Sequence, residues 1–439
     1  MNAGRRSLSP AECLKEPAPG QLLFIILKRS ERLKEKRPMN NKADLRYIEN
    51  HLPKTDDPYL SMMSKEEITK ARLFHRSFPQ YQETPLADLK MLAKHLGVAR
   101  IAVKDESWRF GLNSFKVLGG AYSMARFLAQ ETRTPFEKVT YQYLISEEFR
   151  KKLGSATFIS ATDGNHGRGV AWTARELGQR CIILMPKGTT KARFDNIKAL
   201  GAEVTIEELN YDECVRKAAS LSDQYEHGVI VQDTSWEGYE DIPAWIMQGY
   251  GVMADEAAEQ FGEKPSHIFV QAGVGAMAGA VTGYFSALYP EDPPKILVVE
   301  PNRADCMFRG AEKGDGSRVI VTGEMDSIMA GLSCGEPCEL GWDLFKNHAF
   351  GFLSGEDSIT CRGMRMLAGN FKEDPHVVSG ESGAAGFGAF ASIMLEDALL
   401  DVREKIGLGP GSRVLCFSTE GDTDPVRYKE IVWEGKTYH

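Results

Sequence analysis

Short apolar runs alternate with longer stretches of helical periodicity along most of the chain, from about residue 96 onward. This pattern is typical of a parallel sheet that is covered by helices, and so predicts an α/β fold. The runs that we predict as strands are Arg100–Val103, Ala156–Ser160, Cys181–Met185, Val229–Gln232, Ile268–Gln271, Ile296–Val299 and Val414–Phe417. The predicted helices are Phe115–Glu131, Gly167–Leu177, Ala192–Leu200, Ile242–Phe261 and Ala276–Leu288.

This alternation and the charge pattern divide the chain into three parts. Residues 1–38 hold nine Lys/Arg against four Asp/Glu, which predicts a disordered basic tail. Residues 126–235 contain strands and helices of their own, so we predict a smaller, mobile α/β domain there. The larger domain is then made of residues 39–125 and 236–439. Residues 301–355 are rich in glycine and irregular in pattern, and we predict that they form a long loop region or a cap.

Length and composition exclude several classes of protein. A chain of 439 residues with 42% hydrophobic and 26% charged residues is typical of a globular protein with ample buried core. A formal charge of −8 argues against a nucleic-acid binder, which normally presents a basic face. The apolar run Leu22–Leu27 is too short to span a membrane. The eight cysteines lack the CxxC pairs of a zinc site, so we expect no metal and a reduced, cytoplasmic protein.

A lysine stands at the start of the predicted helix 115–131, after Asn113, Ser114 and Phe115. Either Asn113 or Ser114 can cap this helix. The positive end of the helix dipole disfavours a cation at that position, and Schiff-base chemistry requires a neutral amine. A single lysine at a helix start is usually a solvated side chain. The hypothesis that Lys116 is a catalytic amine therefore depends on its neighbours.

A polar turn follows the predicted strand 156–160 and has the sequence Ala161-Thr162-Asp163-Gly164-Asn165-His166-Gly167. Backbone N–H groups and short polar side chains at a helix N-terminus suit a carboxylate. The residues that would supply them here are Thr162, Gly164, Asn165 and His166. An aspartate in such a turn repels an anion, so Asp163 is either turned away or needed as a base. The simpler interpretation is a tight turn in which Asp163 caps the helix.

A glycine-rich loop, Gly273–Gly279, follows the predicted strand 268–271 and opens a helix. Its small residues let backbone amides approach a phosphate, and the helix dipole adds to the attraction. The loop lacks the Gly-Lys-Ser/Thr ending of a nucleoside triphosphate site. A dinucleotide-binding interpretation stays open, because Glu300 ends the next strand about twenty residues further on, where a ribose-binding acid would stand. That interpretation explains neither Lys116 nor the turn at Asp163.

Two more polar segments follow predicted strands. Asp233 comes directly after the strand 229–232, where its carboxylate can face the same cleft as the other motifs. Ser418 follows the last strand and begins a segment rich in hydroxyl and carboxyl groups that extends to Asp424. Each segment taken alone is more simply a helix cap or a turn. Taken with Lys116 and the glycine loop, they predict a pyridoxal phosphate site.

These motifs resemble those of the tryptophan synthase β-like, fold type II, pyridoxal phosphate enzymes. The resemblance rests on Ser114 with Lys116, on Asn165 with His166, on the loop Gly273–Met277 and on Ser418. Within this family the chain is most similar to the diaminopropionate ammonia-lyases. That similarity runs from about Met39 to the C-terminus and rests on residues 161–167, 232–234, 271–279, 334–337, 379–383 and 418–424. It is specific, because dehydratases of this fold usually lack an aspartate at the position of Asp163.

The resemblance implies two open twisted sheets flanked by helices, a cofactor bound between two domains, and a homodimer. It implies that Lys116 forms the Schiff base with pyridoxal phosphate, that Asn165 hydrogen-bonds the 3' oxygen of the cofactor and that Ser418 faces its pyridine nitrogen. The residues that would hold the phosphate are Gly273, Val274, Gly275, Ala276 and Met277. Those that would bind the substrate carboxylate are Thr162, Gly164 and His166.

We therefore interpret the sequence as a lyase that acts on the small amino acid 2,3-diaminopropionate and gives pyruvate and two molecules of ammonia by α,β-elimination. By resemblance, Asp163 and Asp233 are catalytic bases, Asp163 for the D enantiomer and Asp233 for the L enantiomer. A serine or threonine dehydratase, or another β-eliminating enzyme of the same fold, is the alternative. More distant alternatives are a cofactor-retaining binding protein and a nicotinamide-binding protein.

Overall fold

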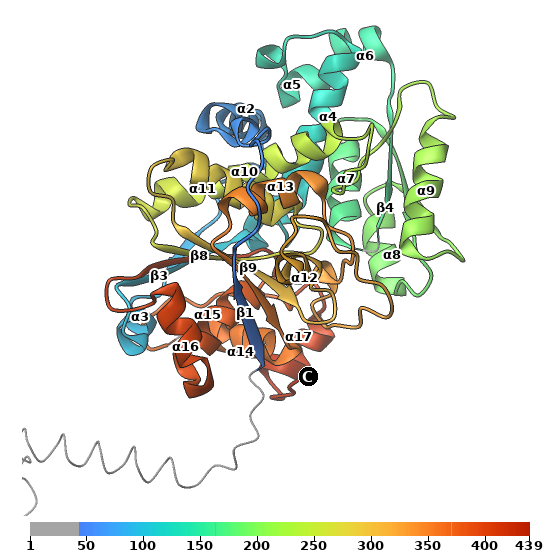
Figure 1. The fold of residues 1–439 in the computed structure, drawn as a ribbon. Helices are drawn as coiled ribbons and strands as arrows, with labels where there is room; N and C mark the ends of the chain where they lie inside the picture. Colours follow the sequence, from blue (N-terminus) through green and yellow to red (C-terminus); the bar gives the residue numbers. More distant parts are fainter. Residues whose placement is uncertain (1–43, 163, 370) are drawn as a thin grey trace, which may run out of the picture. The chain divides into compact units, whose positions relative to one another are not determined.

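The computed structural model describes residues 44–162, 164–369 and 371–439, which belong to one compact unit. The predicted tail, residues 1–38, lies outside the described residues. The unit contains two open sheets, one of seven strands and one of four, and helices cover both of them (Figure 1). The prediction of an α/β fold with two sheets flanked by helices is confirmed.

The larger sheet has the strand order β1-β10-β9-β8-β11-β3-β2. Its strands are β1 (Leu45–Glu49), β2 (Leu86–Asp88), β3 (Arg100–Asp105), β8 (His267–Gln271), β9 (Lys295–Pro301), β10 (Gly351–Gly355) and β11 (Arg413–Ser418). The five central strands run parallel, whereas β1 pairs antiparallel with β10 and β2 pairs antiparallel with β3. Almost every residue of β8, β9 and β11 is buried, as expected for strands with helices on both faces.

The smaller sheet is entirely parallel and has the order β6-β5-β4-β7. Its strands are β4 (Thr157–Ala161), β5 (Arg180–Met185), β6 (Glu203–Ile206) and β7 (Gly228–Ile230). All four fall inside residues 126–235, and all seven strands of the larger sheet fall outside that range. The division into two domains, with the smaller one mobile, stays a prediction, because residues 44–439 form a single compact unit.

Helices account for most of the rest of the described chain. The α-helices are α2 (Lys65–Arg76), α3 (Lys90–Leu96), α4 (Val117–Glu131), α5 (Tyr141–Leu144), α6 (Glu147–Leu153), α7 (Asn165–Glu176), α8 (Lys191–Lys198), α9 (Tyr211–Ser222), α10 (Asp241–Phe261), α11 (Ala276–Leu288), α12 (Cys306–Lys313), α13 (Glu339–His348), α14 (Asp357–Ala368), α15 (Ala385–Leu395), α16 (Leu400–Ile406) and α17 (Pro425–Val432). Short 3-10 helices are η1 (Ser61–Met63), η2 (Glu106–Gly111), η3 (Phe136–Lys138), η4 (Ala330–Leu332) and η5 (Asp397–Leu399). None of the described helices is both long and apolar enough to cross a membrane.

Helix α4, which follows Lys116, packs against both α7 and α10. Glycines permit this close approach. A Cβ atom on Gly249 of α10 would lie 2.3 Å from the carbonyl oxygen of Leu118, and one on Gly169 of α7 would lie 2.9 Å from the Cα of Val117. A side chain at either position would push the helices apart, so these two glycines fix where Lys116 stands relative to α7 and α10.

The prediction of an irregular region over residues 301–355 was wrong for about half of its length. The structure forms α12, η4, α13 and β10 there. These elements are short, and a glycine lets two of them pack closely. A Cβ atom on Gly310 of α12 would lie 2.6 Å from the ring of Trp342 on α13. Glycine inside a short helix interrupts the apolar periodicity that would otherwise predict it.

Candidate active site

The predicted site residues follow the carboxyl ends of strands from both sheets. Thr162 follows β4, Asp233 follows β7, Gly273 follows β8 and Ser418 ends β11. Lys116 follows β3 and η2 and comes directly before α4. Open α/β sheets bind their ligands beyond the carboxyl ends of their strands, so each sheet places its motifs where chemistry is expected.

Lys116 and Asp233 form an ion pair. The Nζ atom of Lys116 donates to Oδ2 of Asp233, and the hydroxyl of Tyr250 donates to the same oxygen at 3.2 Å. The Asp233 side chain is 8% exposed and that of Lys116 is 21% exposed. An amine that can form an imine thus lies beside a nearly buried carboxylate, which is the pair of groups that proton abstraction next to an imine requires.

Asp233 is a carboxylate at neutral pH. Burial by itself would raise its pKa, but the Lys116 ammonium, with smaller contributions from His166 and the hydrogen bonds, holds the pKa of Asp233 below its ordinary value. We attribute the net effect mainly to Lys116, because burial also lowers the pKa of His166 and so keeps that ring neutral. Any event that removes the charge of Lys116 therefore makes Asp233 a stronger base.

The turn after β4 forms the start of α7, which begins at Asn165, two residues earlier than predicted. The Thr162 hydroxyl accepts the N–H of Gly164 at 3.2 Å. The His166 ring is buried, and its Nε2 donates to the carbonyl oxygen of Val231 at 2.8 Å. His166 thereby ties α7 to the segment that carries Asp233. Asp163 lies outside the described residues, so its predicted role stays a prediction.

Asn165 contacts the segment that follows β11. Its Nδ2 donates to Glu420 at 2.6 Å, and Glu420 also accepts the N–H of Ser382 at 3.0 Å. The backbone of Glu420 pairs with that of Ser114, two residues before Lys116. Glu420 thus connects Asn165 on α7 with the lysine segment.

Ser418 is fully buried, and its hydroxyl donates to that of Ser379 at 2.8 Å. Gln271, the last residue of β8, donates from its Nε2 to the carbonyl oxygen of Phe417 at 2.9 Å and to the hydroxyl of Thr419 at 2.9 Å. These hydrogen bonds fix the residues on either side of Ser418. Ser418 therefore keeps one orientation relative to the glycine loop that follows Gln271.

The glycine loop, which we call the glycine cradle, packs so closely against the rest of the protein that larger residues would not fit in it. Gly275 precedes α11 with φ +93°, a conformation that favours glycine, and a Cβ atom there would lie 3.0 Å from both Met307 and Phe345. A Cβ atom on Gly273 would lie 2.9 Å from the carbonyl oxygen of Gly331. The first N–H groups of α11 have no partner inside the helix, so the loop and the helix start can hold a phosphate.

The dinucleotide-binding alternative does not fit the structure. Both carboxyl oxygens of Glu300 accept backbone N–H groups of α12, from Met307 at 2.9 Å and from Phe308 at 2.7 Å. Burial raises the pKa of Glu300 to about 8. The side chain is fully buried and its oxygens accept N–H groups at the start of α12, so they are not available to a ribose hydroxyl.

Tyr250, Glu420 and Ser379 were not among the predicted site residues. Glu420 and Ser379 stand in polar, glycine-containing segments, and that composition could have marked them as candidates. Tyr250 gave no such signal, because it lies in the middle of a long and mostly buried helix. Only its position against Asp233 identifies it.

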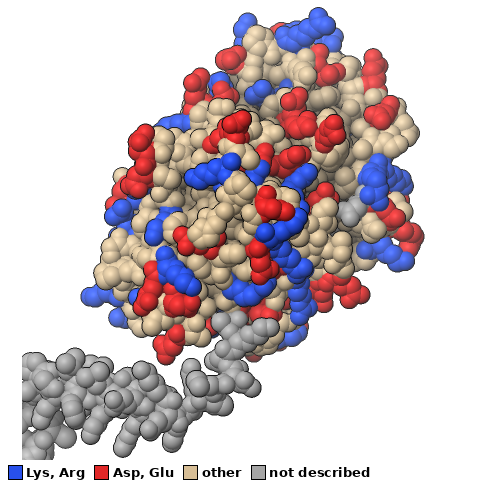
Figure 2. All heavy atoms as spheres, in the orientation of Figure 1, with Lys and Arg blue, Asp and Glu red and all other residues tan. Residues whose placement is uncertain are grey.

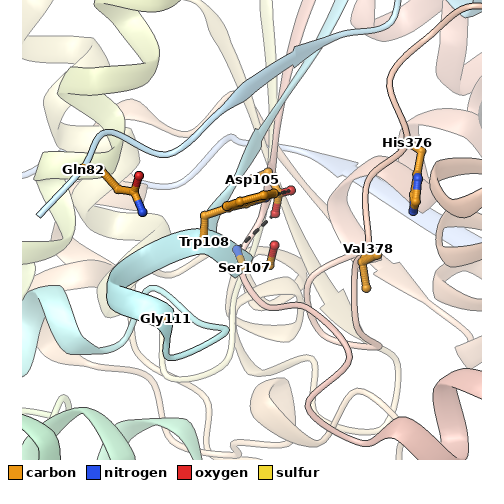
Figure 3. A pocket seen from close by; sticks show the side chains of 7 residues that line it. All are labelled: Gln82, Asp105, Ser107, Trp108, Gly111, His376 and Val378. Atoms are coloured by element: carbon orange, nitrogen blue, oxygen red, sulfur yellow. Dashed lines mark hydrogen bonds between the residues drawn. The ribbon is translucent and has the colours of Figure 1, made fainter. Parts of the chain in front are cut away.

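A cavity of about 440 Å³ lies at the carboxyl end of β3 (Figure 3). Its lining comprises Gln82, Asp105, Ser107, Trp108, Gly111, His376 and Val378. Asp105 accepts the N–H of Ser107 at 3.1 Å and that of the Trp108 indole at 3.2 Å. None of the predicted site residues lines this cavity, so we place the chemistry at Lys116 and not here. Among the described residues, no group of three or more His, Cys, Asp or Glu side chains is arranged to hold a metal ion.

Glu381 and Glu420 are two buried carboxyl groups close to Ser418. Burial and then the charge of Glu420 raise the pKa of Glu381 to about 8, from 4.5 in the unfolded chain. The folded protein therefore binds a proton at Glu381 that the unfolded chain releases above pH 4.5. Stability from this group is fully present below pH 4.5 and is lost as the pH rises through 8.

We expect Glu381→Gln, which is neutral at every pH, to reduce this pH dependence. The free energy of unfolding of the wild type should fall between pH 5 and pH 8 by on the order of a few kcal/mol more than that of the variant. Urea denaturation of both proteins at pH 5, 6.5 and 8 measures the difference. The exposed Glu434→Gln serves as control and should follow the wild type. Parallel curves for Glu381→Gln and wild type would show that Glu381 is ionised in the folded protein.

Comparison with known proteins identifies the family. The family model described as "Pyridoxal-phosphate dependent enzyme" matches residues 78–420. The chain belongs to this family. Diaminopropionate ammonia-lyase of Escherichia coli (strain K12) is 47% identical over 380 residues, which are 85% of this chain and 93% of that protein. The enzyme of the same name from Salmonella typhimurium (strain LT2) is 43% identical over 86% of this chain and 95% of its own.

A solved structure extends this likeness to three dimensions. The crystal structure of diaminopropionate ammonia lyase from Escherichia coli in complex with an aminoacrylate-PLP azomethine reaction intermediate has a TM-score of 0.80 and 44% sequence identity. The match covers 89% of this chain and 97% of that chain. The predicted membership of the fold type II pyridoxal phosphate enzymes is confirmed. Pyridoxal phosphate is the cofactor of this enzyme family. The glycine cradle suits its phosphate, and the Lys116 amine suits its aldehyde.

Proposed function

We propose that the protein converts 2,3-diaminopropionate into pyruvate and two molecules of ammonia by α,β-elimination. The observation that carries this proposal is the contact of Lys116 with a nearly buried carboxylate, Asp233. Both residues follow the carboxyl ends of strands, as the glycine cradle does. The similarity to diaminopropionate ammonia-lyases over 85% of the chain supports the choice of substrate.

Four parts of the chain would hold the cofactor. When bound, pyridoxal phosphate withdraws electrons from the Cα atom of an attached amino acid and so weakens its Cα–H bond. The Lys116 amine would attach it, the loop Gly273–Met277 would hold its phosphate and Asn165 would donate to its 3' oxygen. Ser418 would face its ring nitrogen. A hydroxyl stabilises a protonated ring nitrogen less than a carboxylate does, which favours elimination over reactions that need a stronger electron sink.

The start of α7 would bind the substrate carboxylate. Thr162, Gly164 and His166 lie around the first turn of this helix, where backbone N–H groups and the helix dipole attract an anion. The His166 ring is engaged with Val231, so its contribution would come from the backbone and from the fixed position of the turn. The Cα atom of a substrate bound there would face the side chains of Lys116 and Asp233.

Asp233 would remove the Cα proton of the L enantiomer, and Asp163 that of the D enantiomer. Asp233 accepts a hydrogen bond from the Lys116 amine, and it would be a stronger base whenever that amine is uncharged. The β-amino group must be protonated to depart, so a group that has taken up a proton must return one to the leaving nitrogen. Lys116 would then release the product, which hydrolyses in water to pyruvate and ammonia.

An assay of two products tests this proposal against the dehydratase alternative. The purified enzyme with pyridoxal phosphate is given 2,3-diaminopropionate, serine or threonine, and both the keto acid and ammonia are measured. We expect two ammonia per pyruvate from diaminopropionate, with a kcat/KM well above that for serine. Preferred turnover of serine or threonine, with one ammonia per keto acid, would mean that the protein is a dehydratase.

The glycine cradle provides a second test. We expect Gly275→Ala to weaken pyridoxal phosphate binding by at least about tenfold, or about 1.4 kcal/mol, because the new methyl group displaces Met307 and Phe345 beneath the phosphate loop. Gly262→Ala is the matched control: Gly262 also has a positive φ, of +73°, but nothing lies within 4 Å of the added Cβ. Titration of the apoprotein with the cofactor, followed by absorbance, measures both. Equal loss in the two variants would trace the effect to backbone strain alone.

The remaining assignments concern partners and location. We propose a homodimer in the cytoplasm, with a small amino acid as substrate and no nucleic-acid partner. On the face shown in Figure 2, positive and negative side chains are interspersed, which suits a protein without a polyanionic partner. The thiol of Cys306 donates to the carbonyl oxygen of Cys334, at a donor-to-acceptor distance of 3.7 Å, which suits a reducing compartment.

A further inference from the structure

Tyr250 contacts the carboxylate to which we assign proton removal. It lies on α10, is fully buried, and donates its hydroxyl to Oδ2 of Asp233 at 3.2 Å. Asp233 lies 17 residues earlier, in the segment after β7. The contact is therefore made by the packing of α10 against the site and not by local sequence.

The ring of Tyr250 is held in place by the lysine segment. It packs against Phe115 with ring centroids 4.7 Å apart and planes at 60°. On α4, a Cβ atom at Gly119 would lie 2.5 Å from the Tyr250 ring, so glycine at that position makes room for the ring. Phe115 and Gly119, on either side of Lys116, confine the ring. The hydroxyl of Tyr250 is therefore held in the direction of Asp233.

Two donors share the Oδ2 atom of Asp233, and they differ in what the reaction does to them. The Lys116 amine would bond covalently to the cofactor for part of each turnover, whereas the Tyr250 hydroxyl would take no part in making or breaking bonds. Burial and the Asp233 carboxylate raise the pKa of Tyr250 well above its ordinary value, so it remains a donor throughout the working pH range. Tyr250 is then the donor whose hydrogen bond to the Asp233 carboxylate does not change during turnover.

We propose that Tyr250 is a positioning residue that orients Asp233 for proton removal from the L enantiomer. This inference rests on the proposed function. In this proposal Tyr250 touches neither substrate nor cofactor, and it affects the reaction only by orienting Asp233. It also predicts stereochemical selectivity, because a base on the opposite side of the substrate does not depend on Tyr250.

The other titratable groups near Asp233 come from several elements. Among the described residues, those that interact with it are Lys116 before α4, His166 on α7, Tyr239 after β7, Tyr250 on α10 and Cys338 before α13. Lys116 and Tyr250 are the two of these that hydrogen-bond its carboxylate. A hydrogen bond to the charged form lowers a pKa, so loss of the Tyr250 hydroxyl should raise the pKa of Asp233.

The test compares Tyr250→Phe with a matched control, Tyr284→Phe. The hydroxyl of Tyr284 on α11 donates to Asp255 of α10 at 2.6 Å, so it too joins a buried tyrosine to a buried aspartate. We expect Tyr250→Phe to lower kcat/KM for L-diaminopropionate by about ten- to a hundredfold, the range for losing a hydrogen bond to a charged group, and to leave the D enantiomer within about threefold. The loss should lie in kcat, and the acid limb of the L profile should move to higher pH. Tyr284→Phe should change neither the L-to-D ratio nor the pH profile.

Crystal structures of the wild type and both variants give a readout that does not require turnover. We expect the Asp233 carboxylate to rotate or to occupy two orientations in Tyr250→Phe and to stay fixed in Tyr284→Phe. An unchanged Asp233 together with an unchanged L-to-D ratio would overturn the inference. A wild type that does not process diaminopropionate would refute the proposed function, and the orientation of Asp233 in the crystals would still decide whether Tyr250 positions it.

Discussion

Replacing Lys116 with alanine is expected to remove the visible absorbance of bound pyridoxal phosphate and to lower pyruvate formation by at least on the order of 10³-fold. The physical reason is covalent: among the described residues, the amine that pairs with Asp233 and can join the cofactor is that of Lys116. Absorbance spectra of the purified variant and a single-turnover assay with diaminopropionate measure the two losses. A yellow, active Lys116→Ala protein would end the assignment of this lysine.

Two further variants separate this chemistry from stability. Lys116→Ala also leaves the Asp233 carboxylate nearly buried without its counter-ion, which costs on the order of a few kcal/mol. Lys116→Arg keeps a cation opposite Asp233 but cannot form the imine, so it should fold stably and still lack absorbance and activity. Lys65→Ala is a control, because Lys65 is also a lysine at a helix start and is more than half exposed. It should leave both the spectrum and the activity unchanged.

Asp233→Asn and Asp163→Asn are expected to impair opposite enantiomers. The Cα protons of D and L substrates point to opposite sides of the cofactor plane when the carboxylate and the imine are held fixed, so one base cannot easily serve both. Asp233→Asn should lower turnover of L-diaminopropionate far more than that of the D form, by on the order of 10² to 10⁴-fold, the range for a removed general base. Asp163→Asn should show the reverse preference. Steady-state kinetics with each pure enantiomer measure the four rates.

A nearby carboxylate controls for general effects on the site. Asp422 accepts the side-chain amide of Asn113 at 3.1 Å, three residues before Lys116, and has no predicted role in proton transfer. Asp422→Asn should affect both enantiomers alike. Equal losses on both enantiomers from Asp233→Asn and from Asp163→Asn would mean that these aspartates shape the site or bind the substrate's amino group. The mechanism with two bases would then have to be abandoned.

The parts of the site that the sequence predicted are those that local chemistry specifies. The apolar run of β8, the glycines that follow it and the start of α11 lie within about twenty consecutive residues. The apolar run predicts the strand, and the glycines after it predict a loop that can bind a phosphate. The same holds for Lys116, which stands between β3 and α4, and for Asp233 after β7. Strand ends are visible in sequence, and parallel topology brings the strand ends of each sheet to one edge of that sheet.

The tertiary structure alone decided which side chains meet at that edge. Asn165 and Glu420 are separated by 255 residues, and Tyr250 reaches Asp233 from a helix whose residues are mostly buried on every side. In such a helix a tyrosine cannot be distinguished by pattern from any other core residue, because burial is common to all of them. What makes Tyr250 different is the buried polar group at the end of its ring, and the position of that group depends on how α4 and α10 pack. The sequence by itself therefore determined the fold, the cofactor loop and the lysine, whereas the long-range packing decided the hydrogen-bond partners that set the charge and orientation of Asp233.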